Sequence, residues 1–194
     1  WMIENPGAFT YRHIKPGLNP EVAESILAWL LWARDEHGLV IDYISMNEPN
    51  IGCFIELEPD ENAALLVEIG TRIQERGLQT RILLADTSTL RDCQEFAEGV
   101  WADPEVRPFL GPLVCHSYDQ RWTSDQVLHD LGQFAQDHGR ELWMTEAAWR
   151  GQLDPAVAPT WEHAHNIGIA YSRLLKIGRV TTLFYWQMLD SRYS

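Results

Sequence analysis

Residues 20–38, PEVAESILAWLLWARDEHG, run directly into residues 39–47, LVIDYISMN. Pro20 suits the first turn of a helix and Gly38 suits the position just after its end, so the first segment predicts an amphipathic helix. The second segment is short, apolar and rich in β-branched residues, which is typical of a buried strand. Together they predict one helix–strand unit.

The same unit recurs four more times along the chain. The predicted pairs are helix 59–77 with strand 80–86, helix 88–103 with strand 113–119, helix 124–139 with strand 141–147, and helix 160–178 with strand 180–187. Continuously apolar strands are typical of a sheet covered on both faces, and strict alternation with helices indicates a parallel sheet. Two folds fit this pattern, an open doubly wound sheet and a (β/α)8 barrel.

The strand ends favour the barrel. No strand is followed by a glycine-rich phosphate turn, which argues against a nucleotide-binding sheet. Polar and aromatic residues end the strands instead: Asn47, Glu48, Asp86, His116, Tyr118, Glu146, Trp186 and Gln187. In a barrel these ends open on the one face where active sites are built. We therefore expect an α/β fold, a (β/α)8 TIM barrel.

The chain is short for a complete barrel. It has 194 residues and five predicted strands, whereas a barrel has eight strands and takes about 250 residues. We expect a single domain, residues 1–194, that forms a partial barrel of strands 4 to 8 and is truncated at both ends. A true partial barrel that dimerises is the second interpretation, and it is disfavoured because an open parallel sheet exposes unpaired edges.

The composition excludes some classes of ligand. The net charge is −13 and no cluster of Lys and Arg is present, so we expect no nucleic acid and no anionic polymer as ligand. Nine tryptophans are more than packing needs, and flat indole faces suit sugar-binding clefts. No apolar run reaches the length of a membrane span. The spacing of Cys53, Cys93 and Cys115 fits no disulfide or metal framework, which predicts free thiols.

A second glutamate, placed like Glu48 of the Asn47-Glu48-Pro49 sequence, indicates a pair of catalytic carboxylates. Glu146, in ELWMTEAAW (141–149), ends an apolar strand just as Glu48 does. In a barrel both carboxylates project from the same rim. Retaining glycoside hydrolysis needs two such groups, a nucleophile and an acid/base, about 5–5.5 Å apart.

The neighbouring residues fit the same chemistry. Asn47 can hydrogen-bond a sugar 2-hydroxyl, a contact that strengthens in the transition state. His116 and Tyr118 are two apart on a strand and point to one face. A phenol near Glu146 can orient that carboxylate and keep it ionised.

Three tryptophans are candidates for sugar contacts. Trp186 can stack on a sugar ring, with packing at the rim as the alternative. Trp122 and Trp149, in the loops after two of the strands, can form outer subsites, and packing explains them equally well.

Other residues have structural explanations. We expect Asp86 to cap the following helix, and Trp29 and Trp32 to lie in the core because they share a helical face in a Leu-rich stretch. His163 and His165 lie at i and i+2 of a predicted helix and do not share a face, so no metal site is expected there.

At these motifs the chain resembles the clan A glycoside hydrolases. ISMNEPN (44–50) is similar to the clan's Asn-Glu motif after strand four, and WMTEAAW (143–149) to the segment with its nucleophile after strand seven. CHSYD (115–119) and FYWQ (184–187) resemble its strand-six and strand-eight motifs. The closest resemblance is to family 30, with families 5 and 39 as alternatives. The arginine on the clan's second strand has no counterpart here.

The resemblance implies an O-glycosyl hydrolase that cleaves a β-linked polysaccharide or glycoside with retention. Glu48 is then the acid/base and Glu146 the nucleophile, with no cofactor and no metal. An oligosaccharide or polysaccharide is the expected partner, and a secreted or extracellular location is expected, while the sequence leaves the oligomeric state open. The alternative is a non-catalytic carbohydrate-binding or interaction protein on a degenerate barrel.

Overall fold

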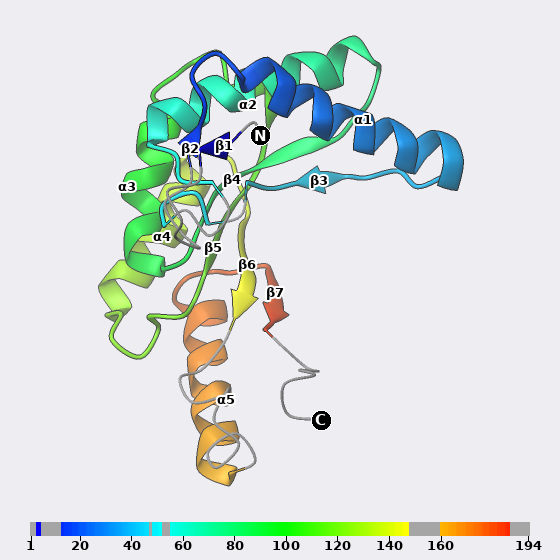
Figure 1. Ribbon diagram of the computed structural model, residues 1–194. Coiled ribbons are helices and arrows are strands. Elements are labelled where there is room, and N and C mark those ends of the chain that lie inside the picture. The colour runs from blue at the N-terminus through cyan, green and yellow to red at the C-terminus, as the bar shows by residue number, and fades with distance from the viewer. Residues whose placement is uncertain (1–2, 5–12, 47, 52–54, 148–159, 187–194) are drawn as a thin grey trace. The chain divides into compact units, whose positions relative to one another are not determined.

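The computed structural model describes residues 3–4, 13–46, 48–51, 55–147 and 160–186 (Figure 1). The order of strands in the main sheet is β3-β4-β5-β6-β7, and they form an α/β half-barrel of five parallel strand–helix units. The strands are β3 (Tyr43–Ile44), β4 (Arg81–Thr87), β5 (Leu110–His116), β6 (Leu142–Ala147) and β7 (Thr182–Tyr185). The expected fold class and alternation are confirmed, and β3 and β7 end the order as the sequence predicts.

Each of these strands follows a helix. The helices are α1 (Asn19–His37), α2 (Pro59–Glu75), α3 (Leu90–Trp101), α4 (Asp125–Asp137) and α5 (Trp161–Lys176), with a short 3-10 helix, η1 (Arg107–Phe109), before β5. The chain divides into two compact units. The first unit comprises Trp1–Asp86 and Glu95–Gly111, and the second comprises Thr87–Gln94 and Pro112–Ser194.

In the first unit, α1 and α2 lie side by side (Figure 1). Proline occupies the first turn of α1, and Gly38 follows its last residue with φ 63°, a left-handed conformation that glycine adopts without steric cost. On α2, Gly70 lies so close to the Phe109 ring that a Cβ there would fall 2.2 Å from a ring carbon. The 3-10 helix thus packs directly on the α2 backbone.

Trp29 and Trp32 are not in the core, contrary to the sequence prediction. Their exposed fractions are 50% and 52%. The buried positions of α1 form a different stripe, Val22, Ala23, Leu27, Leu30 and Ala33. Helical spacing assigns two residues to one face of a helix, but it does not say whether that face is covered.

A small antiparallel pair was not predicted. Strand β1 (Ile3–Glu4) pairs with β2 (His13–Ile14). Each strand has two residues, which is too short to show a period in the sequence.

In the second unit, β6 lies between β5 and β7 and pairs with both in parallel. All seven residues of β5 are buried, as expected for a strand covered on both faces. The four residues of β7 are half-buried or exposed, so that expectation is wrong for β7. The reason is its terminal place in the strand order, where no further strand covers it among the described residues.

The helices of the second unit begin with hydroxyl caps. Ser124 Oγ accepts a hydrogen bond from the amide of Val127, and Thr160 Oγ1 accepts one from the amide of His163. These caps confirm the predicted helix starts. In the described part of the chain, no helix is long and apolar enough to cross a membrane. Cys93 and Cys115 are buried free thiols, as expected, and Cys53 lies outside the described residues.

The packing of α4 depends on a glycine. A Cβ on Gly132 would lie 2.3 Å from the carbonyl oxygen of Gly178, which follows α5. We predict that Gly132→Ala lowers the free energy of unfolding by about 1 to 3 kcal/mol, the usual cost of overpacking a site that cannot yield. Chemical denaturation of the chain measures this loss.

Gly168, within α5, is the matched control. A Cβ there would meet nothing within 4 Å, so Gly168→Ala should raise stability by up to about 1 kcal/mol through helix propensity. Equal stabilities of the two alanine variants would contradict the close approach of Gly132 to Gly178.

Candidate functional site

The backbone around Glu146 is fixed on both sides. The carbonyl oxygen of Glu146, near the end of β6, accepts a hydrogen bond of 3.0 Å from the amide of Ser117. The next carbonyl oxygen, that of Ala147, accepts from the amide of Trp186 at 3.0 Å and from the Tyr171 hydroxyl at 3.1 Å. Burial, with the nearby Tyr185, raises the pKa of the Tyr171 phenol well above its usual range, so this donor stays protonated.

Two predicted site residues converge on the Glu146 carboxylate. The Tyr118 hydroxyl donates to Oε2 at 2.5 Å, and Nδ1 of His116 lies 3.5 Å from the same oxygen. The two rings meet edge to face at 5.7 Å. His116 is fully buried, whereas the Glu146 side chain keeps 18% of its surface exposed. The carboxylate is therefore oriented from within the protein while remaining accessible to solvent.

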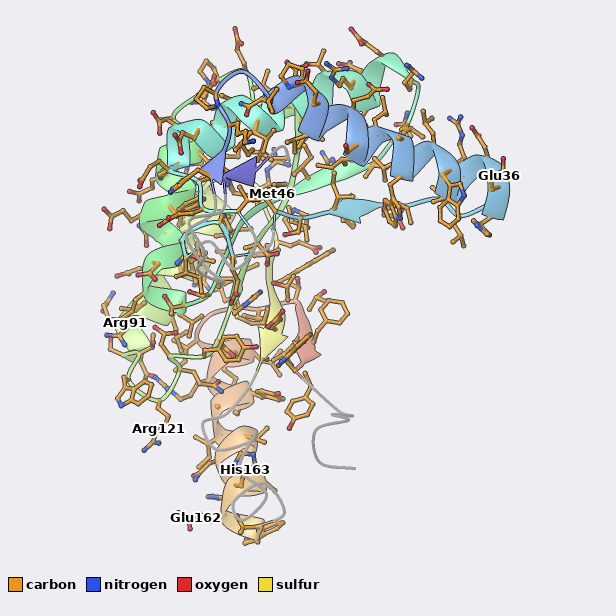
Figure 2. All side chains as sticks on the ribbon, viewed as in Figure 1. Glu36, Met46, Arg91, Arg121, Glu162 and His163 are labelled. Carbon is orange, nitrogen blue, oxygen red and sulfur yellow. The ribbon has the colours of Figure 1, made fainter. Side chains whose placement is uncertain are left out.

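The sequence predicted His116 and Tyr118 on one strand, but β5 ends at His116. Tyr118 therefore belongs to the loop between β5 and α4, where a buried carboxylate lies next to it. Asp119 Oδ1 accepts from the amide of Leu90 at 2.9 Å, and Oδ2 accepts from the amide of Arg91 at 3.3 Å. Oδ2 also binds Arg91 Nε at 3.0 Å and the Thr123 hydroxyl at 3.0 Å. Asp119 thus caps α3 from a distant part of the sequence, which the sequence analysis missed. Figure 2 shows Arg91 at the start of α3 and Arg121 in the loop that follows β5.

Two candidate tryptophans present exposed rings in the second unit. Trp122 is 57% exposed, with the Arg121 guanidinium 5.4 Å from its ring centroid. Trp186, just after β7, is 41% exposed. Both rings have surface with which a ligand could stack. The third candidate, Trp149, lies outside the described residues.

In the first unit, Glu48 follows β3 at a strained turn. Its φ is 49°, in the left-handed region that residues other than glycine seldom adopt. The Glu48 amide donates to the carbonyl oxygen of Asp86 at 3.0 Å, and the Glu48 carbonyl oxygen accepts from the amide of Ile51 at 3.2 Å. This turn is therefore fastened to the end of β4. Asn47 lies outside the described residues.

The end of β4 is strained as well. Ala85 and Asp86 have φ values of 77° and 56°. Asp86 is buried and its Oδ2 accepts a hydrogen bond from the Ser45 hydroxyl. Its expected role as the cap of the next helix needs correction, since the first-turn amides of α3 donate to Asp119 and to the Thr89 hydroxyl. Asp86 instead ties the segment after β3 to β4, which a sequence cannot reveal because Ser45 and Asp86 are 41 positions apart.

The pair His163 and His165 behaves as predicted. His163 is buried in α5, whereas Glu162 and His165 are exposed. Figure 2 shows Glu162 and His163 together in the first turn of that helix. Both ring nitrogens of His163 are buried without a hydrogen-bond partner in the described part of the chain. The two histidines therefore do not share a face.

Comparison with known proteins identifies the fold. No protein-family model and no curated protein matches the sequence. Among solved structures, SrfJ from Salmonella typhimurium is 18% identical with a TM-score of 0.73, covering 95% of this chain and 41% of SrfJ. The glycoside hydrolase family 30 subfamily 8 xylanase Xyn30A from Clostridium acetobutylicum is 17% identical with a TM-score of 0.72, covering 99% of this chain and 48% of Xyn30A. A family 39 β-xylosidase from Caulobacter crescentus is 19% identical with a TM-score of 0.63, covering 90% of this chain and 39% of the xylosidase.

The likeness extends over nearly all of this chain but less than half of each solved structure. The expected resemblance to the barrels of families 30 and 39 is confirmed at the level of the fold. Identities this low show the fold alone, so residue roles are a matter for proposal.

Proposed function

We propose that this chain carries the catalytic carboxylates of a retaining glycoside hydrolase that acts on a β-linked glycan. The observation that supports it most directly is the 2.5 Å hydrogen bond from the Tyr118 hydroxyl to Glu146 Oε2. A nucleophile needs a fixed orientation and access to its substrate. Glu146 has both, and it stands at the C-terminal end of a barrel-type strand, where such folds build active sites.

The proposed reaction has two displacement steps. In the first, a Glu146 oxygen bonds to the anomeric carbon while the bond to the leaving oxygen breaks, and Glu48 gives that oxygen a proton. In the second, Glu48 takes a proton from water, and the water oxygen bonds to the anomeric carbon and releases Glu146. Net retention follows because the configuration inverts twice.

The remaining candidates have supporting roles in this proposal. Tyr118 holds the nucleophile, and the buried His116 lies behind the same oxygen. Asn47 binds the sugar 2-hydroxyl. Trp186 stacks on a sugar, and Trp122 and Trp149 form outer subsites. No metal or cofactor takes part.

The domain proposal is that this chain supplies strands 4 to 8 of a complete barrel. It is supported by the terminal places of β3 and β7 in the strand order and by the greater length of the similar structures. An experimental structure of the complete barrel should place the carboxylate groups of Glu48 and Glu146 about 5–5.5 Å apart. A separation of about 6.5–9.5 Å, the inverting range, would contradict the retaining mechanism.

A non-catalytic carbohydrate-binding protein is the alternative. It is supported by the fact that this chain covers less than half of each named structure. The two functions differ in one measurement, since a binding protein retains a glycan without releasing reducing ends.

The deciding experiment is a glycan panel with two readouts, binding by calorimetry and product release by chromatography. It is run on this chain alone and on a polypeptide in which three strand–helix units precede it. Products with retained anomeric configuration support the hydrolase. Binding to both polypeptides with no product from either supports the alternative.

A further inference from the structure

Arg173, in α5, donates hydrogen bonds to the loop that carries Tyr118. Its Nη1 donates to the carbonyl oxygen of Gln120 at 3.1 Å, and its Nη2 donates to that of Thr123 at 2.7 Å. Its Nε donates to Asp125 Oδ1 at 2.9 Å. All three guanidinium nitrogens are thus engaged with the segment between Tyr118 and the first turn of α4.

We infer that Arg173 is a positioning residue that holds the Tyr118 phenol against Glu146 by fixing the loop 117–124. The inference rests on the proposed function for its meaning in catalysis. Arg173 acts on the carboxylate only through the loop, so it is not a catalytic residue. Its two contacts with the loop are with backbone carbonyl groups, and the backbone of a loop sets where its side chains point.

The loop is also anchored at its other end. The amide of Ser117 donates to the carbonyl oxygen of Glu146 at 3.0 Å, and the buried Asp119 is bound to the first turn of α3. Tyr118 lies between these two anchors. With Arg173 holding the far side, rotation of the loop would have to break several hydrogen bonds at once, so the phenol has little freedom to leave Oε2.

Arginine is the residue suited to this task. Its planar fork can serve three acceptors in different directions, whereas the lysine ammonium is a single point on a flexible stem. The Arg173 side chain is 27% exposed, so the hydrogen bonds are only partly in competition with water. Arg173→Lys keeps the charge and removes the fork, which makes it the informative variant.

Arg179 provides a matched control. It follows α5 and binds the side chains of Gln133 and Gln136 on α4, with Nη1 3.3 Å from Gln133 Oε1. It therefore links the segment after α5 to α4, and its hydrogen bonds go to α4 and not to the loop 117–124. Arg179→Lys should leave the Tyr118 loop unchanged.

The first test needs no activity. In the full chain labelled with ¹³Cζ-tyrosine, the Tyr118 signal is assigned by its loss in Tyr118→Phe. Glu146→Gln should shift this signal in the otherwise unchanged protein and in Arg179→Lys, because the phenol touches the carboxylate. In the Arg173→Lys protein, Glu146→Gln should leave the chemical shift of the Tyr118 signal nearly unchanged. A shift of undiminished size in Arg173→Lys overturns the inference, whether or not the protein is an enzyme.

The second test is a double-mutant cycle on kcat/KM in the complete barrel. Tyr118→Phe and Arg173→Lys should each lower kcat/KM by roughly 10- to 100-fold, the scale of a misplaced catalytic group. The double variant should be no worse than Tyr118→Phe alone. Additive losses would show that Arg173 affects the rate independently of Tyr118, which overturns the inference. Arg173→Gln is the second variant if Arg173→Lys fails to fold, and thermal unfolding reports which case applies.

The two proposals fail in different ways. If the protein hydrolyses no glycan but the tyrosine signal behaves as expected, the loop inference stands and the proposed function falls. If glycans are cleaved but Arg173→Lys does not diminish the shift of the Tyr118 signal that Glu146→Gln causes, the proposed function stands and the loop inference falls.

Discussion

Glu146→Ala is expected to reduce kcat/KM by on the order of 10⁴-fold or more on every glycan that the complete barrel cleaves. Loss of a covalent nucleophile removes the intermediate itself, and effects of this size follow in other enzymes that depend on one. The measurement is the initial rate with natural and aryl substrates. Added azide, which fits in the space of the lost carboxylate, should give an inverted glycosyl azide in a single displacement.

Glu141→Ala is the control for this variant. Glu141 precedes β6 at its other end and accepts a hydrogen bond of 2.7 Å from Trp143 Nε1. Its loss should leave the rate unchanged. If Glu146→Ala remains as active as Glu141→Ala while both proteins fold, Glu146 is not the nucleophile.

Glu48→Ala should show a loss that depends on the leaving group. Proton donation is worth about 10²- to 10⁴-fold, and a natural sugar alcohol needs all of it. A nitrophenol leaves almost without that help, so formation of the glycosyl-enzyme from an aryl glycoside should be nearly unaffected. Hydrolysis of the intermediate should slow, because water has lost its base. The measurement is burst kinetics with an aryl glycoside beside the steady-state rate with the glycan.

Azide separates the roles of the two glutamates. In Glu48→Ala it should attack the glycosyl-enzyme without a general base, form a bond from nitrogen to the anomeric carbon and displace Glu146, which gives a retained glycosyl azide. An inverted azide from Glu48→Ala together with a retained azide from Glu146→Ala would mean that the two assignments are exchanged.

The sequence was informative wherever the physical cause is local. Helix ends were predictable because Gly38, Gly77 and Gly139 supply left-handed residues, with φ values of 63°, 67° and 63°. Alternation of helix and strand followed from periodicity and gave the fold class. Strand length was less predictable, since the described residues 39–46 contain only the two-residue strand Tyr43–Ile44. Apolar composition marks a segment as buried or extended but does not determine how many residues pair.

The site shows the same division between local and distant causes. Glu146 was found because it stands near the end of an apolar strand, and Tyr118 because it follows one, although the sequence placed Tyr118 on the strand itself. The cap that Asp119 places on α3 was missed because Asp119 and Leu90 are 29 positions apart. Arg173 was missed for a similar reason, as it lies 53 positions from Gln120. Contacts of this kind depend on how elements pack, and no pattern within one element indicates them.

The left-handed residues near the end of β4 and after β3 have a consequence for the evolution of this protein. A left-handed conformation costs an L-residue with a Cβ about 1 to 2 kcal/mol, so Ala85, Asp86 and Glu48 narrow the substitutions that a lineage can accept. At position 85, which is 3% exposed, glycine would be tolerated, while the β-branched residues valine, isoleucine and threonine would be selected against. Position 86 can exchange aspartate for asparagine only if the hydroxyl of Ser45 keeps an acceptor. Drift at these sites is thus restricted by backbone geometry, independently of any selection on catalysis.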